Sequence, residues 1–179
     1  MKKTANRWNV LVAVEDIPDA GLHIEIDAPA AVRAGLAELA GLRDLPQLSA
    51  VFDLTRRGAG VHVSGQVDAR VGQTCVVTLE PIENTVSEAV DLKFAPASGT
   101  EADPKIARKH PLDGDEPPEP LYGGSLDLGA LAAEFLILGI DPYPRKADAE
   151  FAPPKDEDSG EHPFAALESL KKNLGGGQS

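Results

Sequence analysis

VHVSGQVDARVGQTCVVTLEP, residues 61–81, decides the fold of this chain. Residues 61–70 alternate between apolar and polar side chains, the period of a β-strand with one face buried and one exposed. The apolar positions are Val61, Val63, Val67 and Ala69, and the polar positions are His62, Ser64, Gln66, Asp68 and Arg70. Gly65 interrupts the apolar face, which indicates a β-bulge. The stretch therefore predicts a half-buried strand with a bulge at Gly65.

Further strands are predicted on both sides of this one. Upstream, Leu48, Ala50, Phe52 and Leu54 alternate with other residues, and the loop RRGAG at 56–60 predicts a hairpin. The remaining predicted strands are residues 8–14, 22–26, 74–80, which include the only cysteine, and 85–93. Short strands joined by tight turns favour an antiparallel β-sheet or a small β-barrel.

Helices are expected to pack on these strands. Apolar spacing predicts one helix at about 29–40, ended by Gly41, and another that Asp127 caps and that runs to about Gly139. The apolar stripe of the second helix is predicted to comprise Leu128, Leu131, Phe135 and Leu138, flanked by Ala132, Leu136 and Ile140. Residues 163–173 predict a short last helix. The fold class is α+β, with two to three helices packed on the sheet or barrel.

Two acidic segments rich in proline and glycine, residues 95–120 and 147–161, separate these elements. Such composition favours disorder, because little apolar surface is available to offset the entropy of ordering. We therefore predict a single α+β domain over residues 1–146, with a mobile loop at about 95–120. Residues 147–179 are predicted to be an acidic linker and a short C-terminal helix.

The charge of the chain restricts its partners. It has 17 basic and 29 acidic side chains, a net charge of −12, and an acidic surface repels phosphate backbones and membrane headgroups. A broad nucleic-acid-binding face is disfavoured unless the charge is segregated. The apolar run at 8–14 is too short for a signal peptide, and no run reaches the roughly 18 apolar residues of a membrane span. We expect a cytoplasmic protein with no membrane partner.

No catalytic, cofactor or metal site is predicted. Cys75 is best explained as a small apolar residue in a strand, and the four histidines are scattered without ligand spacing. Carboxylates around the strands, namely Glu80, Glu83, Glu88 and Asp91, offer acid–base chemistry as an alternative, but solvated strand faces explain them more simply.

The candidate RNA-facing residues are Arg56, Arg57 and Arg70. The first two lie at the predicted hairpin tip, and the third lies on the polar face of the adjoining strand. Side chains such as these bind phosphate if they converge, whereas ordinary solvated arginine is the simpler explanation.

Three blocks of the sequence together resemble the YceD family. They are GQTCVVTLEP at 72–81, GGSLDLGAL with EFLIL within 123–138, and HPFAALESLK at 162–171. The resemblance implies a role in the accumulation of large-subunit (23S) ribosomal RNA and hence in ribosome biogenesis. Many members of the family have C-x-x-C where this chain has residues 72–75, so Gly72 replaces the first cysteine. Any metal or redox role of such a pair does not carry over to this chain.

Two classes of function follow from these observations. One is a non-enzymatic factor that binds large-subunit ribosomal RNA or a pre-ribosomal protein, for which the acidic charge favours a protein partner at least as much as RNA. The other is an enzyme of unknown reaction that uses the carboxylates of the sheet. A third possibility is a structural adapter that presents Phe164, Leu167 and Leu170 of the last helix to a groove.

Overall fold

The computed structural model of the chain describes residues 8–97 and 118–151. They belong almost wholly to the first of two units into which the chain divides, Met1–Ala149; of the second, Glu150–Ser179, the described part includes only Glu150 and Phe151. The elements in order are β1 (Leu11–Ala13), the 3₁₀ turn η1 (Val14–Asp16), β2 (Leu22–Asp27), α1 (Ala30–Ala40), β3 (Asp44–Arg57), β4 (Gly60–Thr74), β5 (Pro81–Pro96), β6 (Glu119–Leu121), β7 (Ser125–Asp127) and α2 (Leu128–Gly139). The predicted C-terminal helix lies outside the described residues.

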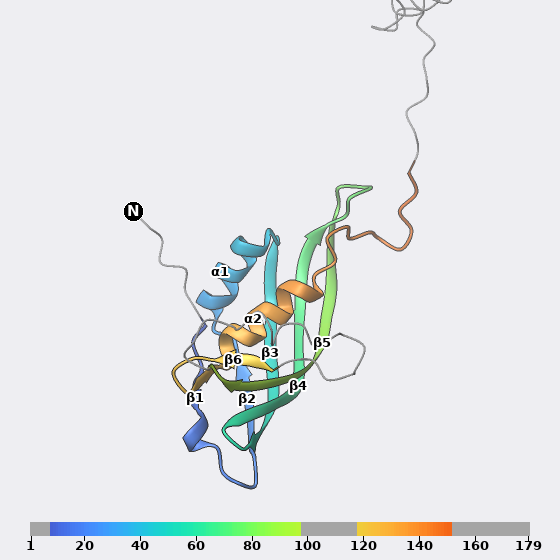
Figure 1. The fold of residues 1–179 in the computed structure, drawn as a ribbon. Coiled ribbons are helices and arrows are strands. Elements are labelled where there is room, and N and C mark those ends of the chain that lie inside the picture. Colours follow the sequence, from blue (N-terminus) through green and yellow to red (C-terminus); the bar gives the residue numbers. More distant parts are fainter. Residues whose placement is uncertain (1–7, 98–117, 152–179) are drawn as a thin grey trace, which may run out of the picture. The chain divides into compact units, whose positions relative to one another are not determined.

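Five strands form one sheet in the order β2-β3-β4-β5-β6 (Figure 1). Strands β2 to β5 are antiparallel to their neighbours, whereas β6 pairs with the end of β5 in parallel. Among the described residues β2 and β6 are the two edges and do not pair with each other, so the sheet is open. Strands β1 and β7 form a separate antiparallel pair. The predicted α+β fold with an antiparallel sheet is confirmed, and its barrel alternative is not.

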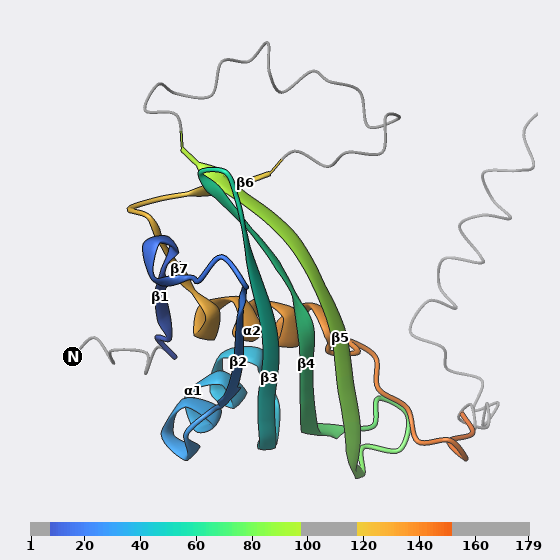
Figure 2. The ribbon, with the colours of Figure 1, turned by 90° about the horizontal axis from the view of Figure 1, so that it is seen from below.

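The apolar face of the sheet carries both helices (Figures 1 and 2). Helix α2 packs on β4 and β5, and α1 packs on β3. All eight apolar positions predicted for β3 and β4 are buried: Leu48, Ala50, Phe52, Leu54, Val61, Val63, Val67 and Ala69. Because the side-chain period of a strand is two, the same register leaves the alternate, polar positions on the opposite face. We call that opposite face of β2–β5 the outer face.

Gly65 does not form the predicted bulge. It pairs regularly with Phe52 on β3 and Val90 on β5, and the register shift in β3 lies between Asp44 and Gln47 instead. A Cβ at position 65 would lie 2.1 Å from the Val51 carbonyl oxygen and 2.9 Å from Cδ1 of Phe52. Glycine is therefore present because β3 approaches closely at this point.

The strand predicted at 74–80 is also wrong. Strand β4 ends at Thr74, β5 begins at Pro81, and the residues between them form a turn. The Cys75 amide donates to the Glu80 carbonyl and the Leu79 amide donates to the Cys75 carbonyl, both at 2.9 Å. These hydrogen bonds close the chain on itself, so no ladder can continue through this segment.

Other predicted boundaries shift for similar reasons. Only Leu11–Ala13 of the N-terminal segment predicted at 8–14 is a strand, because the 3₁₀ turn follows directly. The predicted loop at 95–120 is shorter at both ends, since β5 continues to Pro96 and β6 begins at Glu119. The middle of that loop and most of the predicted linker at 147–161 lie outside the described residues.

Both predicted helix ends are confirmed. Gly41 follows α1 in the left-handed conformation with φ +67°, and its amide donates to the Ala37 carbonyl. Asp127 caps α2, because its Oδ1 accepts hydrogen bonds from the amides of Ala130 at 3.1 Å and Val10 at 3.0 Å. Neither helix of the described part is long and apolar enough to cross a membrane.

Candidate functional site

The hairpin tip is exposed, as predicted. Arg56 and Arg57 end β3, and the two residues Gly58 and Ala59 connect them to β4. Gly58 has φ +62°, the positive value that the tight hairpin turns require at their first central position. Both arginines are exposed, but as neighbours in a strand they point to opposite faces of the sheet.

Arg70 lies far from this tip. It is ten residues along β4 from Gly60, which pairs with Arg57, and at about 3.3 Å per residue that separation is about 33 Å. Its Nη2 forms an ion pair with Oε1 of Glu83 on β5. The structure therefore places Arg56 and Arg57 side by side in the chain and does not bring Arg70 to them. The role of these three residues toward RNA stays a prediction.

A cleft beside the hairpin tip gathers other basic groups around Arg57. Its volume is about 560 Å³, and its lining includes Arg57, His62 and Lys93 together with the apolar residues Phe94, Pro96 and Pro118. His62 is already engaged, because its Nε2 lies 2.6 Å from Oδ1 of Asp91. The cleft combines cationic groups with apolar walls.

The outer face as a whole is acidic. Its exposed carboxylates include Glu25, Asp27, Asp53, Asp68, Glu83 and Asp91, whereas its permanently charged cations are Arg57, Arg70 and Lys93. Hydrogen bonds order several of the carboxylates: Asp53 bonds to Nδ1 of His23 at 2.7 Å, and Asp68 accepts from the Ser87 hydroxyl at 2.6 Å. The hydrogen bond from Asp53, followed by that from Glu25, raises the pKa of His23 above its usual value.

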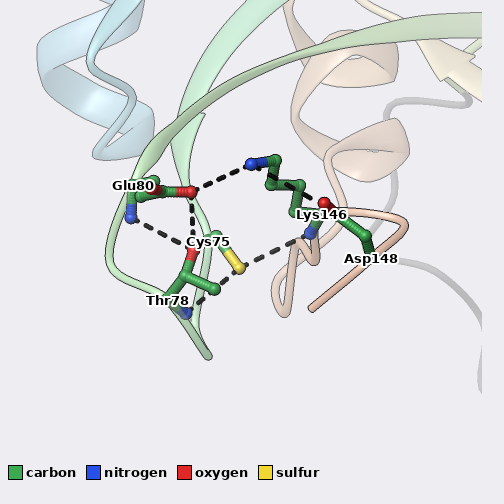
Figure 3. A network of polar contacts seen from close by, with 5 residues as sticks. All are labelled: Cys75, Thr78, Glu80, Lys146 and Asp148. Atoms are coloured by element: carbon green, nitrogen blue, oxygen red, sulfur yellow. Dashed lines mark hydrogen bonds and ion pairs between the residues drawn. The ribbon is translucent and has the colours of Figure 1, made fainter. Parts of the chain in front are cut away.

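The turn between β4 and β5 carries an ordered network around Cys75 (Figure 3). Its buried sulfur accepts hydrogen bonds from the amides of Thr78 and Lys146, each at 3.4 Å. Lys146 in turn extends Nζ to Oε2 of Glu80 at 3.1 Å and lies 3.9 Å from Oδ1 of Asp148. The network therefore ties the turn to the segment that follows α2.

The protonation of Cys75 is altered by the same contacts. Hydrogen bonds from Thr78, and then from the Lys146 amide, lower the pKa of the thiol to about 6, against the opposing effect of burial. The expectation of an apolar cysteine in a strand is thus wrong on two counts, since Cys75 lies in a turn and accepts hydrogen bonds. Within residues 8–97 and 118–151, no group of three or more His, Cys, Asp or Glu side chains is arranged to hold a metal ion.

Three of the carboxylates considered for acid–base chemistry, Glu83, Glu88 and Asp91, lie apart on β5. Glu83 and Asp91 are eight residues apart on β5, a distance of about 27 Å, and each contacts a different basic partner, Arg70 and His62 respectively. Glu88 pairs with buried Val67 and lies on the helix side of the sheet. Glu83, Glu88 and Asp91 therefore do not converge on one site.

Sequence reasoning missed the role of Lys146, because its partners Cys75 and Glu80 are about seventy residues away in the chain. Arg33 likewise has a structural role: its guanidinium donates to the carbonyls of Leu45 at 3.1 Å and Ala28 at 2.6 Å. No sequence pattern could have identified either contact, since both depend on tertiary packing.

Comparison with known proteins gives one match. A family model described as "Large ribosomal RNA subunit accumulation protein YceD" matches residues 63–171, which is more than half of the chain. The matched range begins in β4 and includes the Cys75 turn, β5 and α2. No curated protein and no solved structure matches the chain.

Proposed function

The chain belongs to the YceD family, and on that premise we propose that it promotes the accumulation of large-subunit (23S) ribosomal RNA as a non-enzymatic factor of ribosome biogenesis that binds a basic ribosomal protein. The observation that carries the proposal is the family match over residues 63–171. The description of the family connects its members with the accumulation of large ribosomal subunit RNA. It names no partner, and the choice of partner rests on charge.

The charges of the outer face support a protein partner over direct contact with RNA. At least six exposed carboxylates stand against three permanently charged cations on that face, Arg57, Arg70 and Lys93, and one of these cations, Arg70, is in an ion pair with Glu83. Such a surface repels a phosphate backbone and attracts a cationic protein. The separation of Arg70 from the hairpin tip further weakens the case for one RNA-binding patch.

RNA contact is the alternative, and the cleft beside the hairpin tip favours it. Arg57, His62 and Lys93 line that cleft with Phe94. Cationic groups next to an aromatic ring are the combination that binds single-stranded nucleic acid by phosphate contact and base stacking. Direct RNA binding by the chain would be centred there, or on Arg56 and Arg57.

Affinity purification of the tagged chain with and without ribonuclease tests the proposal. We expect large-subunit ribosomal proteins to co-purify and to remain bound after ribonuclease treatment. Loss of these proteins on ribonuclease treatment would instead indicate that RNA mediates the contact. Recovery of neither ribosomal protein nor large-subunit RNA would contradict the proposed function itself.

A further inference from the structure

Leu79 occupies an unfavourable position in two respects. It has φ +60°, the single positive value among the non-glycine residues that the structure describes, and L-residues other than Asn and Asp rarely adopt this conformation. Its side chain is also 75% exposed, so burial does not offset the strain. Strained residues of this kind concentrate at functional sites.

Two further exposed apolar side chains lie on the segments that meet at this turn. Val76 belongs to the same turn and is 44% exposed, and Tyr143 follows α2 and is 71% exposed. The Val76 amide donates to the carbonyl of Pro144, the residue after Tyr143, at 3.0 Å. We call Val76, Leu79 and Tyr143 the Leu79 patch.

Hydrogen bonds hold together the two segments that carry the patch. The Cys75 sulfur bonds to the Lys146 amide, and the Lys146 side chain bonds to Glu80 (Figure 3). At the start of the post-helix segment, the buried Gln73 side chain donates to the Asp141 carbonyl at 2.8 Å. A preorganised apolar surface loses little conformational entropy on binding, which is the property of an interface anchor.

We propose that the Leu79 patch is the apolar anchor by which the chain docks onto its basic ribosomal-protein partner. This inference rests on the proposed function and identifies the surface through which the chain contacts its partner. Glu80, Asp141 and Asp148 are exposed and lie close to the patch residues along the chain, as do the cations Arg145 and Lys146. Lys146 contacts Glu80 and Asp148, so the excess near the patch is one negative charge, and the main attraction for a basic partner comes from the acidic outer face of the same sheet.

The complementary surface is an apolar pocket with basic side chains at its rim. A second copy of this chain is a poorer occupant, because two chains that each carry a net charge of −12 repel each other. A protein of opposite charge meets no such repulsion.

The test uses the tagged full chain and, as probe, RNA-free total protein from purified large ribosomal subunits. Captured proteins are identified by mass spectrometry, and the affinity of the captured protein is then measured for each variant. The variants are Leu79→Asn and Tyr143→Ser. Their matched controls are Leu39→Gln and Tyr122→Ser, since Leu39 is 71% and Tyr122 75% exposed elsewhere on the molecule.

We expect Leu79→Asn and Tyr143→Ser each to weaken binding by at least about tenfold, as truncation of an interface anchor does. The controls should bind like the unchanged chain. Leu79→Asn should keep or raise the melting temperature, because asparagine tolerates positive φ. A loss of binding without a loss of stability then assigns the effect to the interface.

The outcomes separate this inference from the proposed function. If the unchanged chain captures a ribosomal protein and both patch variants bind it equally well, the patch is not the anchor although the proposed function stands. If the unchanged chain captures none and binds large-subunit RNA instead, the protein partner of the proposed function is wrong, and the anchor with it. A homodimer that Leu79→Asn dissociates would assign the patch to a second copy and overturn the inference.

Discussion

At the scale of single residues, Asp127 connects the N-terminal segment to α2. One carboxylate oxygen accepts both the Ala130 amide of the first helical turn and the Val10 amide that precedes β1. We predict that Asp127→Ala lowers the free energy of unfolding by about 1–2 kcal/mol, because both amides lose their acceptor. Asp127→Asn, which keeps an acceptor oxygen, should cost much less in the same urea titration. Equal losses in the two variants would show that the cap is not the cause.

Cys75 shows how one residue makes stability depend on pH. The pKa of the Cys75 thiol is about 6 in the folded chain. This is below the ordinary cysteine pKa of roughly 8.5 that applies to the unfolded chain. The unfolded state therefore binds more protons between these values, and stability increases with pH across that window. This contribution is complete above about pH 8.5 and is lost as the pH falls through about 6.

The prediction is that Cys75→Ser folds but lacks this increase. Urea midpoints of the unchanged chain and the variant should diverge as the pH rises from about 6 to 8.5, with the unchanged chain gaining relative to the variant. His23 is common to both chains, so its raised pKa cancels in the difference. Parallel pH profiles would mean that the thiol is not ionised more readily in the fold. Elemental analysis of both chains should find no stoichiometric zinc.

At the scale of elements, α2 shows which of its faces packs on the sheet. Leu136 is fully buried, Phe135 is half-buried and Leu138 is 72% exposed. We predict that Leu136→Ala costs about 2–5 kcal/mol by lost transfer energy and a cavity, that Phe135→Ala costs less, and that Leu138→Ala costs under about 0.5 kcal/mol. Denaturant melts of the three variants check this ranking. A larger loss at Leu138 than at Leu136 would contradict the observed orientation of the helix.

This helix also shows where sequence patterns lose information. In the stripe predicted for α2, Leu128 and Leu131 are buried, whereas Phe135 is half-buried and Leu138 is exposed. Ala132 and Leu136, which were predicted only to flank the stripe, are buried instead. The helix LGALAAEFLILG is apolar on almost every side, so periodicity identifies the element but not its face. In β3 and β4 the apolar and polar positions alternate cleanly, and every predicted buried position there is buried.

The candidate site was predicted less fully than the fold. The exposed hairpin with Arg56 and Arg57 followed from local turn chemistry, which a sequence records directly. The Cys75 turn was predicted as a strand, because VVTL has strand composition. The composition does not reveal the hydrogen bonds that fix the turn, which the Cys75 amide donates to the Glu80 carbonyl and the Lys146 amide donates to the Cys75 sulfur. Contacts of Lys146 and Arg70 depend on segments brought together by folding, so no local pattern could reveal them.

At the scale of the whole molecule, charge and apolar surface divide between different regions. The outer face of the sheet is acidic, the hairpin tip is basic, and the Leu79 patch at the other end of β4 is apolar. A basic partner protein can be attracted by the acidic face and held by the apolar anchor, since complementary charge mainly raises association rates whereas buried anchors slow dissociation. Association should accordingly weaken as salt concentration rises.

Complementation of a strain that lacks this chain distinguishes the acidic face from the arginines. One variant replaces Asp53, Asp68 and Asp91 with Asn, which removes three charges but keeps acceptor oxygens for the hydrogen bonds of the face. The other replaces Arg56, Arg57 and Arg70 with Ala. Each exposed charge pair is worth about 0.2–1 kcal/mol, so the acidic variant should bind the basic partner roughly threefold to 150-fold more weakly.

We expect the arginine variant to restore large-subunit ribosomal RNA levels and the acidic variant to fail, provided that circular dichroism shows both to be folded. Direct binding to RNA would reverse the result, because loss of phosphate contacts lowers affinity and flattens its dependence on salt, by a slope of roughly 0.7 to 0.9 for each contact. Failure of the folded arginine variant, together with rescue by the acidic one, would therefore show that RNA is bound through Arg56, Arg57 or Arg70, and the double variant that keeps Arg70 would then test the hairpin by itself. In that case the acidic face would serve to exclude RNA from the rest of the molecule.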